Sequence, residues 1–74
     1  MKVTDGEGNV ADVLRTYLVH TDDDALGVDK GTTLYLVSIG SSGMFALYDP
    51  DLDAMLVVEP WEIAKVASIT WEAP

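Results

Sequence analysis

The stretch TTLYLVSIGSSGMFALYD, Thr32 to Asp49, decides the fold of this chain. Its two halves, Thr32 to Ile39 and Met44 to Asp49, are rich in β-branched, aromatic and aliphatic residues, which favour strands. The four residues between them, GSSG at Gly40 to Gly43, are typical of a hairpin loop. The sequence therefore predicts two consecutive antiparallel strands in the middle of the chain.

Three more strands are predicted around this hairpin, from short apolar runs bounded by polar loops. Before it, Arg15 to His20 is a strand and Asp22 to Gly31 is a long polar loop. After it, Ala54 to Val58 and Ala67 to Trp71 are strands. Pro60 to Val66 lies between the last two strands, and its leading proline favours a short 3₁₀ or helical turn.

The N-terminal residues are less regular. Met1 to Asn9, MKVTDGEGN, is polar and glycine-rich and is predicted to be a flexible lead. Val10 to Leu14 has helical spacing with Asn9 as an N-cap, whereas the residues after it favour a strand. The pattern therefore favours a helical turn before the first strand, within a single domain that spans residues 10–74.

Large apolar residues of the strands and of the helical turn make up the predicted core. They are Leu18, Leu34, Leu36, Val37, Phe45, Leu47, Leu56, Val58, Ile63 and Ile69. Trp61 and Trp71 are expected in the core or at its rim, because so small a domain needs bulky side chains to fill it.

Composition limits the classes of function. The chain has 74 residues, 49% of them hydrophobic, and 13 acidic against 4 basic residues give a formal net charge of −9. Four scattered cations cannot form a phosphate-binding patch, so neither nucleic acid nor an anionic membrane is expected as a direct partner. A basic protein surface is the expected partner, and a homodimer would add stability to a small domain. Without a leader-like or membrane-length apolar run, a soluble cytoplasmic protein is expected.

Two groups of three aspartates are the candidate partner-binding residues: Asp22, Asp23, Asp24 and Asp49, Asp51, Asp53. The second group matches the start of an EF-hand loop, but Ala54 and Pro60 stand where that loop requires glycine and glutamate, so no metal is expected. Asp49-Pro50-Asp51 instead fits the opening of a turn. If the two groups converge, they form one anionic surface.

No catalytic residue and no cofactor are expected. His20 is the only histidine, and no nucleophile motif stands beside it. The glycines of GSSG lie between two strands and lack the lysine of a phosphate-binding loop.

The order of elements from Arg15 to Trp71 resembles the small barrel of the Src-homology-3 type. His20 to Val37, HTDDDALGVDKGTTLYLV, is similar to the long acidic loop of that fold with its Lys-Gly exit, and Pro60 to Val66 is similar to its proline-led 3₁₀ turn. The resemblance implies an all-β, five-stranded barrel with a short turn before the last strand.

The resemblance does not extend to the site where members of that family bind proline-rich peptides. That site is built from aromatic residues. Only Tyr17 and Phe45 match such positions here, and Ile63 stands where a tyrosine is expected. The string ALYD, which peptide-binding members carry in the first strand, lies here in the third predicted strand, at Ala46 to Asp49.

These features predict a non-catalytic, acidic protein-binding module. The preferred hypothesis is a small inhibitor that blocks the basic, nucleic-acid-binding surface of a target, as phage-encoded DNA-mimic proteins and anti-CRISPR proteins do. The alternative is an accessory or adaptor domain that binds its partner through an apolar patch or a sheet edge. In that case the acidity would reflect adaptation to a saline cytoplasm.

Overall fold

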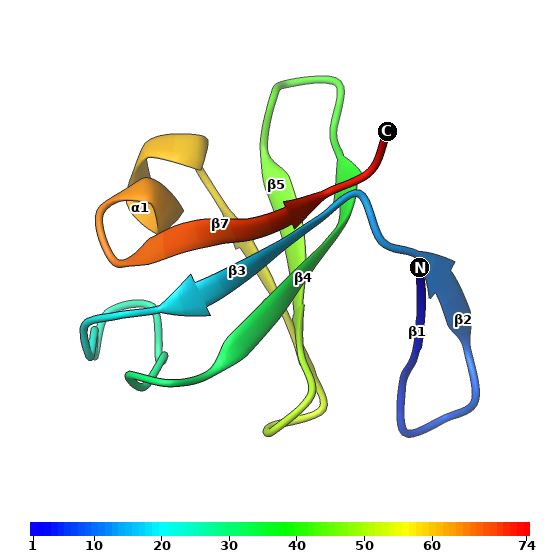
Figure 1. Ribbon diagram of the computed structural model, residues 1–74, viewed down its shortest axis with the longest axis horizontal. Coiled ribbons are helices and arrows are strands. Elements are labelled where there is room, and N and C mark those ends of the chain that lie inside the picture. The colour runs from blue at the N-terminus through cyan, green and yellow to red at the C-terminus, as the bar shows by residue number, and fades with distance from the viewer.

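Seven strands and one short helix make up the computed structural model, which describes residues 1–74. Along the chain they are β1 (Lys2–Thr4), β2 (Val10–Asp12), β3 (Arg15–Val19), β4 (Thr33–Ile39), β5 (Phe45–Asp49), β6 (Ala54–Val58), α1 (Pro60–Ala64) and β7 (Ala67–Glu72) (Figure 1). All five strands predicted from the sequence are confirmed, as is the helical turn that begins at Pro60.

The five longer strands form one antiparallel sheet in the order β6-β5-β4-β3-β7. The first four of them, β3 to β6, are successive neighbours along the chain, and β7 returns to pair with β3. The all-β prediction is therefore confirmed. Strands β6 and β7 are the two edges of the sheet and do not pair with each other, so the sheet is not closed into a barrel.

The core lies between one face of this sheet, α1 and the β3–β4 loop. Leu34, Leu36 and Leu47 from the central strands are almost completely buried. The loop contributes Val28, which is 2% exposed, and α1 contributes Ile63. The helix begins at Pro60. No helix of the structure has the length and apolar character needed to cross a membrane.

Three predicted core residues lie elsewhere. Leu18 is 43% exposed because side chains alternate along a strand, and its neighbours Tyr17 and Val19 take the inward positions. Ile69 is 47% exposed because it lies on β7, an edge strand that no further strand covers. Val37 is only half-buried and points to the opposite side of the sheet from Leu36.

The two tryptophans differ. Trp71 is half-buried, as expected for a residue at the rim of the core. Trp61 is 61% exposed, so its predicted core position is wrong. Its ring lies on the outside of α1, where the Lys65 ammonium group is 5.5 Å from the ring centroid. Ile63 fills the inward position of this single helical turn, and a second large side chain on it therefore faces solvent.

The N-terminal segment forms a second, two-stranded sheet. Strands β1 and β2 pair with Val3 opposite Ala11, so the helical turn predicted over Val10 to Leu14 is wrong. The Asp5 carboxylate shapes the connecting loop by accepting hydrogen bonds from the Glu7 and Asn9 backbone N–H groups, both at 2.9 Å. Residues 1–9, predicted as a flexible lead, therefore supply β1 and the loop of a hairpin that stands beside the main sheet (Figure 1).

Candidate protein-binding surface

Three loops lie at the same end of the molecule. Because β3 to β6 are successive antiparallel neighbours, the β3–β4 loop and the β5–β6 turn leave the sheet at one end. The β1–β2 loop joins them, since the Gly6 N–H donates a hydrogen bond of 2.8 Å to Asp53 Oδ1. In Figure 1 the β5–β6 turn and the β1–β2 loop form the lower edge, and the β3–β4 loop is at the lower left.

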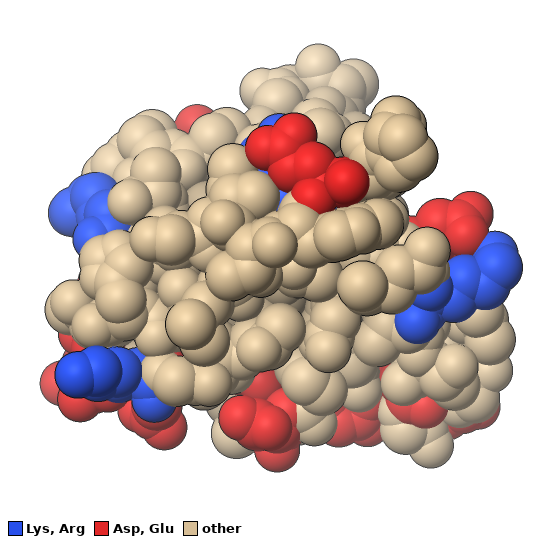
Figure 2. All heavy atoms as spheres, in the orientation of Figure 1, with Lys and Arg blue, Asp and Glu red and all other residues tan.

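These loops hold most of the acidic residues of the chain, and we call them together the acidic end. Nine of the thirteen acidic residues belong to it, with Asp49 included as the last residue of β5: Asp5, Glu7, Asp22, Asp23, Asp24, Asp29, Asp49, Asp51 and Asp53. Lys30 is the only basic residue within the loops, so this end carries −8 of the formal net charge of −9. Figure 2 shows carboxylates gathered along the same lower edge, below a surface that is mostly uncharged.

The alternating aspartates form a turn, as predicted. Asp49 Oδ1 accepts a hydrogen bond of 2.9 Å from the Asp51 N–H, which closes the turn after β5. Asp49 is only 2% exposed, so its carboxylate serves the turn, and its contact with a partner stays a prediction. Asp51 is exposed and accepts no hydrogen bond within the chain. No group of three or more acidic or histidine side chains is arranged to hold a metal ion.

Asp53 joins the turn to two other parts of the molecule. It adopts a positive φ of 49°, which aspartate tolerates better than most residues. Its Oδ1 accepts hydrogen bonds from the Tyr48 hydroxyl, at 2.6 Å, and from the Gly6 N–H. The hydrogen bond to Asp53, together with burial of the phenol, raises the pKa of Tyr48 to about 12.

The consecutive aspartates also differ in their roles. Asp22 Oδ1 accepts a hydrogen bond of 2.7 Å from the Lys30 N–H, and Asp23 Oδ1 accepts one of 3.0 Å from the Leu26 N–H. These bonds hold the loop in the fold that inserts Val28 into the core. Asp24 is exposed and accepts no hydrogen bond, so it is free to meet a partner. The topology thus places both predicted triplets at one end, and partner contact stays a prediction.

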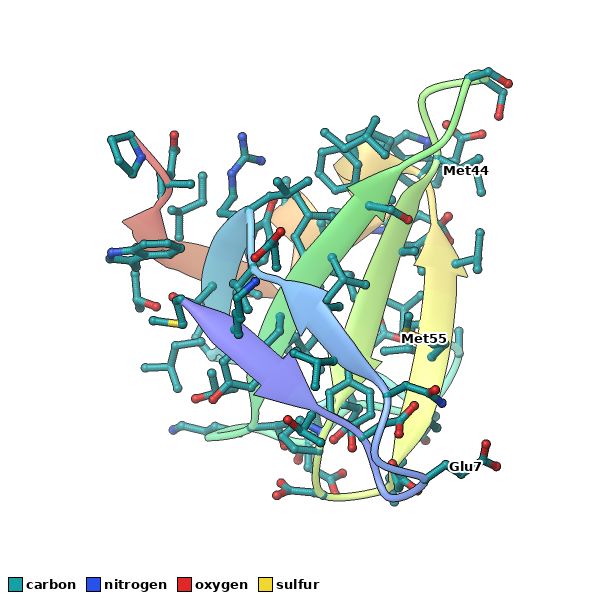
Figure 3. All side chains as sticks on the ribbon, turned by 90° about the vertical axis from the view of Figure 1, so that its right-hand side faces the viewer. Glu7, Met44 and Met55 are labelled. Carbon is teal, nitrogen blue, oxygen red and sulfur yellow. The ribbon has the colours of Figure 1, made fainter.

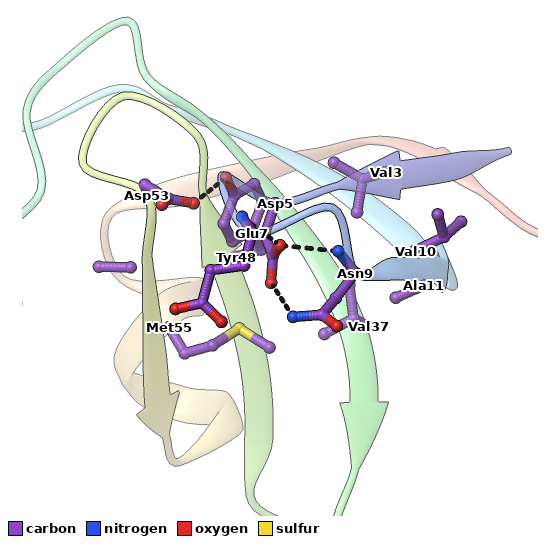
Figure 4. Close-up of a pocket in the computed structure, with 11 residues that line it drawn as sticks. Val3, Asp5, Glu7, Asn9, Val10, Ala11, Val37, Tyr48, Asp53 and Met55 are labelled. Carbon is purple, nitrogen blue, oxygen red and sulfur yellow. Dashed lines mark hydrogen bonds between the residues drawn. The ribbon is translucent and has the colours of Figure 1, made fainter.

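A groove that the sequence did not reveal adjoins the acidic end. It has a volume of about 270 Å³ and lies between the β1–β2 hairpin and the outer face of the main sheet (Figure 4). Val3 and Ala11 of the hairpin face Val37 and Met55 of the sheet across it. The view onto the hairpin in Figure 3 shows Met55 beside it and Glu7 at the tip of its loop. The alternation in KVT and VAD was the available signal, but strands of three residues are too short to stand out.

The two aromatic positions shared with peptide-binding barrels are not open. Tyr17 and Phe45 are 4% and 9% exposed, and the Arg15 guanidinium lies over both rings, 5.8 and 5.7 Å from their centroids. Arg15 Nη1 donates a hydrogen bond of 2.8 Å to the Tyr17 hydroxyl, which raises the pKa of Arg15. A proline-rich peptide would therefore find a cation in place of an exposed aromatic surface.

The outer edge of the sheet at β6 carries exposed apolar side chains. Met55 and Val57 are 55% and 65% exposed, and Leu52 in the preceding turn is 65% exposed. No strand pairs with the outer backbone edge of β6. This edge is a second place at which a partner could bind.

His20, the only histidine, is exposed at the end of β3, where its Nδ1 lies 3.4 Å from Thr21 Oγ1. This separation is longer than the roughly 2.6–3.2 Å of a hydrogen bond between a nucleophile and its base. Comparison of the whole chain with protein-family models, curated proteins and solved structures gave no match.

Proposed function

We propose that the protein is a non-catalytic, acidic binding module that blocks a basic, nucleic-acid-binding surface on a target protein. The observation that carries the proposal is the gathering of nine carboxylates at one end of the fold, eight in three loops and Asp49 at the end of β5. A charge distribution of this kind attracts a basic surface over distances comparable to the Debye length. It also repels nucleic acid, which makes the protein a competitor for the nucleic-acid site and not a ligand of nucleic acid.

The loops that bear the charges are held by the fold. Asp5, Asp22, Asp23 and Asp53 each accept backbone hydrogen bonds, and the hairpin loop is joined to the β5–β6 turn. These bonds order the backbone of the loops before binding, so the free carboxylates that the loops carry, among them Asp24 and Asp51, need less ordering on binding. Phage-encoded DNA-mimic inhibitors, including anti-CRISPR proteins, use fixed acidic surfaces in this way, and we place the protein in that functional class, acting in the cytoplasm.

The fold assignment that goes with this proposal is the Src-homology-3-like type. The return of β7 to pair with β3 and the proline-led helix before β7 support it. The open gap between β6 and β7, spanned by α1, is its main departure from a closed barrel. On this assignment the fold is a scaffold, because the acidic loops and not the covered aromatic positions supply the contact surface.

Capture of the partner tests the proposal. The immobilised chain is exposed to lysate of the source organism at low salt, next to a variant with Asp24→Asn and Asp51→Asn. These two side chains accept no hydrogen bonds, so the variant should fold normally. We expect the wild type to capture a basic protein, the variant to capture less of it, and the wild type to displace nucleic acid from it. A captured protein that binds nucleic acid undisturbed would contradict the proposal.

The matched control removes the same charge elsewhere. Asp12→Asn with Glu72→Gln neutralises two carboxylates outside the acidic end, which pair with Lys2 and Arg15. This control should capture the partner as well as the wild type does. Equal losses for both double variants would mean that net charge, and not the acidic end, governs binding.

The second candidate function is an adaptor that binds through the edge strand β6. Its support is the exposed apolar row of Leu52, Met55 and Val57 beside an unpaired backbone edge. Binding of this kind, including homodimer formation, would depend little on salt and would be abolished by Val57→Lys, which places a charge on the edge. Retained capture by the Val57→Lys variant would favour the acidic end.

A further inference from the structure

The groove beside the hairpin combines apolar walls with a negatively charged end. Val3 and Ala11 are directly paired across the hairpin, and both are half-buried because they face the main sheet. Val37 and Met55 form the opposite wall. Asp5, Glu7 and Asp53 lie where the groove meets the acidic end (Figure 4).

The carboxylates at this end retain free hydrogen-bonding capacity. Glu7 accepts no hydrogen bond within the chain. Asp53 receives both of its hydrogen bonds on Oδ1, which leaves Oδ2 without a donor. No lysine or arginine lines the groove. A cation that entered it would therefore meet carboxylate oxygens that no basic side chain of the groove pairs with.

The size of the groove restricts its occupant. Pockets for whole cofactors and drug-sized ligands have volumes of about 300 to 1,000 Å³. The groove, at about 270 Å³, is below this range and suits one long side chain. Arginine fits its chemistry better than lysine, because the guanidinium is planar, weakly hydrated and able to donate to several carboxylate oxygens at once.

We propose that the groove receives an arginine side chain of the basic partner protein. The aliphatic stem lies against Val3, Val37 and Met55, and the guanidinium donates to Glu7 and Asp53. This inference rests on the proposed function, since it names the group of the partner that the acidic end selects. Long-range attraction by the acidic end brings the partner close, and the groove then fixes its orientation.

Titration with small probes tests the groove without the partner. The ¹⁵N-labelled chain is titrated with N-acetyl-arginine N-methylamide and followed by the amide signals of Glu7, Asn9, Asp53 and Met55, at constant ionic strength. We expect saturable shifts confined to the groove. The citrulline analogue, which has the same shape and no charge, should give none, and the lysine analogue should bind more weakly. Shifts that are the same for arginine and citrulline, or none for either, would overturn the proposal.

Two variants test whether the arginine probe binds in the groove. Ala54→Phe adds a ring at an exposed groove-lining position and should abolish the arginine shifts, while the dispersion of the spectrum reports that the chain is folded. Glu7→Gln should weaken binding about two- to fivefold, as expected for an exposed charge pair. Asp24→Asn, outside the groove, should change nothing. Shifts centred on residues 22–24 would contradict the groove and leave the acidic-inhibitor proposal standing. Arginine binding in the groove together with failed partner capture would support the groove and contradict the acidic-inhibitor proposal.

Discussion

At the residue scale, Asp53 decides how the candidate surface is assembled. It takes a left-handed backbone conformation at the end of the β5–β6 turn and accepts hydrogen bonds from a strand residue, Tyr48, and from a hairpin residue, Gly6. Asp53, which the sequence predicts as a partner contact, therefore also stabilises the fold. The carboxylates without such a structural role, among them Asp24 and Asp51, are the better candidates for recognition.

The Tyr48–Asp53 hydrogen bond predicts an alkaline transition. The pKa of Tyr48 is raised from the ordinary 10.0 to about 12 in the folded chain. A raised folded pKa contributes stability that is complete below pH 10 and is lost as the pH rises through about 12. Absorbance of tyrosinate should therefore show a titration step near pH 12 that belongs to Tyr48. Tyr48→Phe should remove that step, and Asp53→Asn should move it toward 10; an unchanged step in Tyr48→Phe would contradict the assignment.

The burial of the core predicts different stability costs for two leucines that the sequence placed in the core alike. Leu36 is 1% exposed and Leu18 is 43% exposed. Leu36→Ala should lower the free energy of unfolding by about 2 to 5 kcal/mol, because a large buried side chain is removed. Leu18→Ala should cost less than about 1 kcal/mol. Urea denaturation measures both values, and similar values for the two variants would show that the assigned faces of β3 and β4 are wrong.

At the element scale, the β1–β2 hairpin is the part that sequence reasoning missed. The strands from β3 to β7 could be predicted, because each is an apolar run bounded by turn residues. The hairpin has only three residues in each strand and a glycine-rich loop, and such a pattern is hard to distinguish from a flexible lead. The turn role of Asp49 was predictable, whereas its burial and the groove depend on contacts between distant segments.

Gly6 predicts how the hairpin is attached. A Cβ at this position would lie 2.9 Å from Asp53 Cγ and closer still to Oδ2, and Asp53 cannot retreat without losing its hydrogen bonds. Gly6→Ala should therefore detach the loop and speed amide exchange in β1 and β2 about fivefold, the equivalent of one hydrogen bond. Gly40→Ala is the control, since its Cβ would meet only Met44 O at 3.7 Å. Equal exchange in wild type and Gly6→Ala would show that this contact does not hold the hairpin.

At the scale of the whole molecule, repulsion among the acidic side chains opposes the stability of the fold. The acidic end gathers a formal charge of −8 at one end of the fold, and like charges at that density repel one another. The triplets could be recognised in the sequence, but their convergence follows from the antiparallel order of the strands, and the contribution of Asp5 and Glu7 follows from the hairpin. Recognition of a basic partner, as proposed above, would account for this electrostatic cost.

The same repulsion predicts that removing charges from the acidic end stabilises the fold. Asp24→Asn with Asp51→Asn removes two charges and no hydrogen bond, so the melting temperature should stay the same or rise at low salt. The difference from wild type should shrink as salt is added, because screening already weakens the repulsion. A lower melting temperature for this double variant would mean that these two side chains support the fold.

The rate of association with the captured partner tests the central claim most directly. Rates are measured at salt concentrations from about 0.05 M to about 0.5 M, a range over which the Debye length falls severalfold. If the acidic end is the contact surface, the wild-type rate should fall steeply with salt, and Asp24→Asn/Asp51→Asn should be slower at low salt with a flatter dependence. Asp12→Asn/Glu72→Gln should stay close to the wild type. Rates that are the same for all three proteins at low salt would contradict the account.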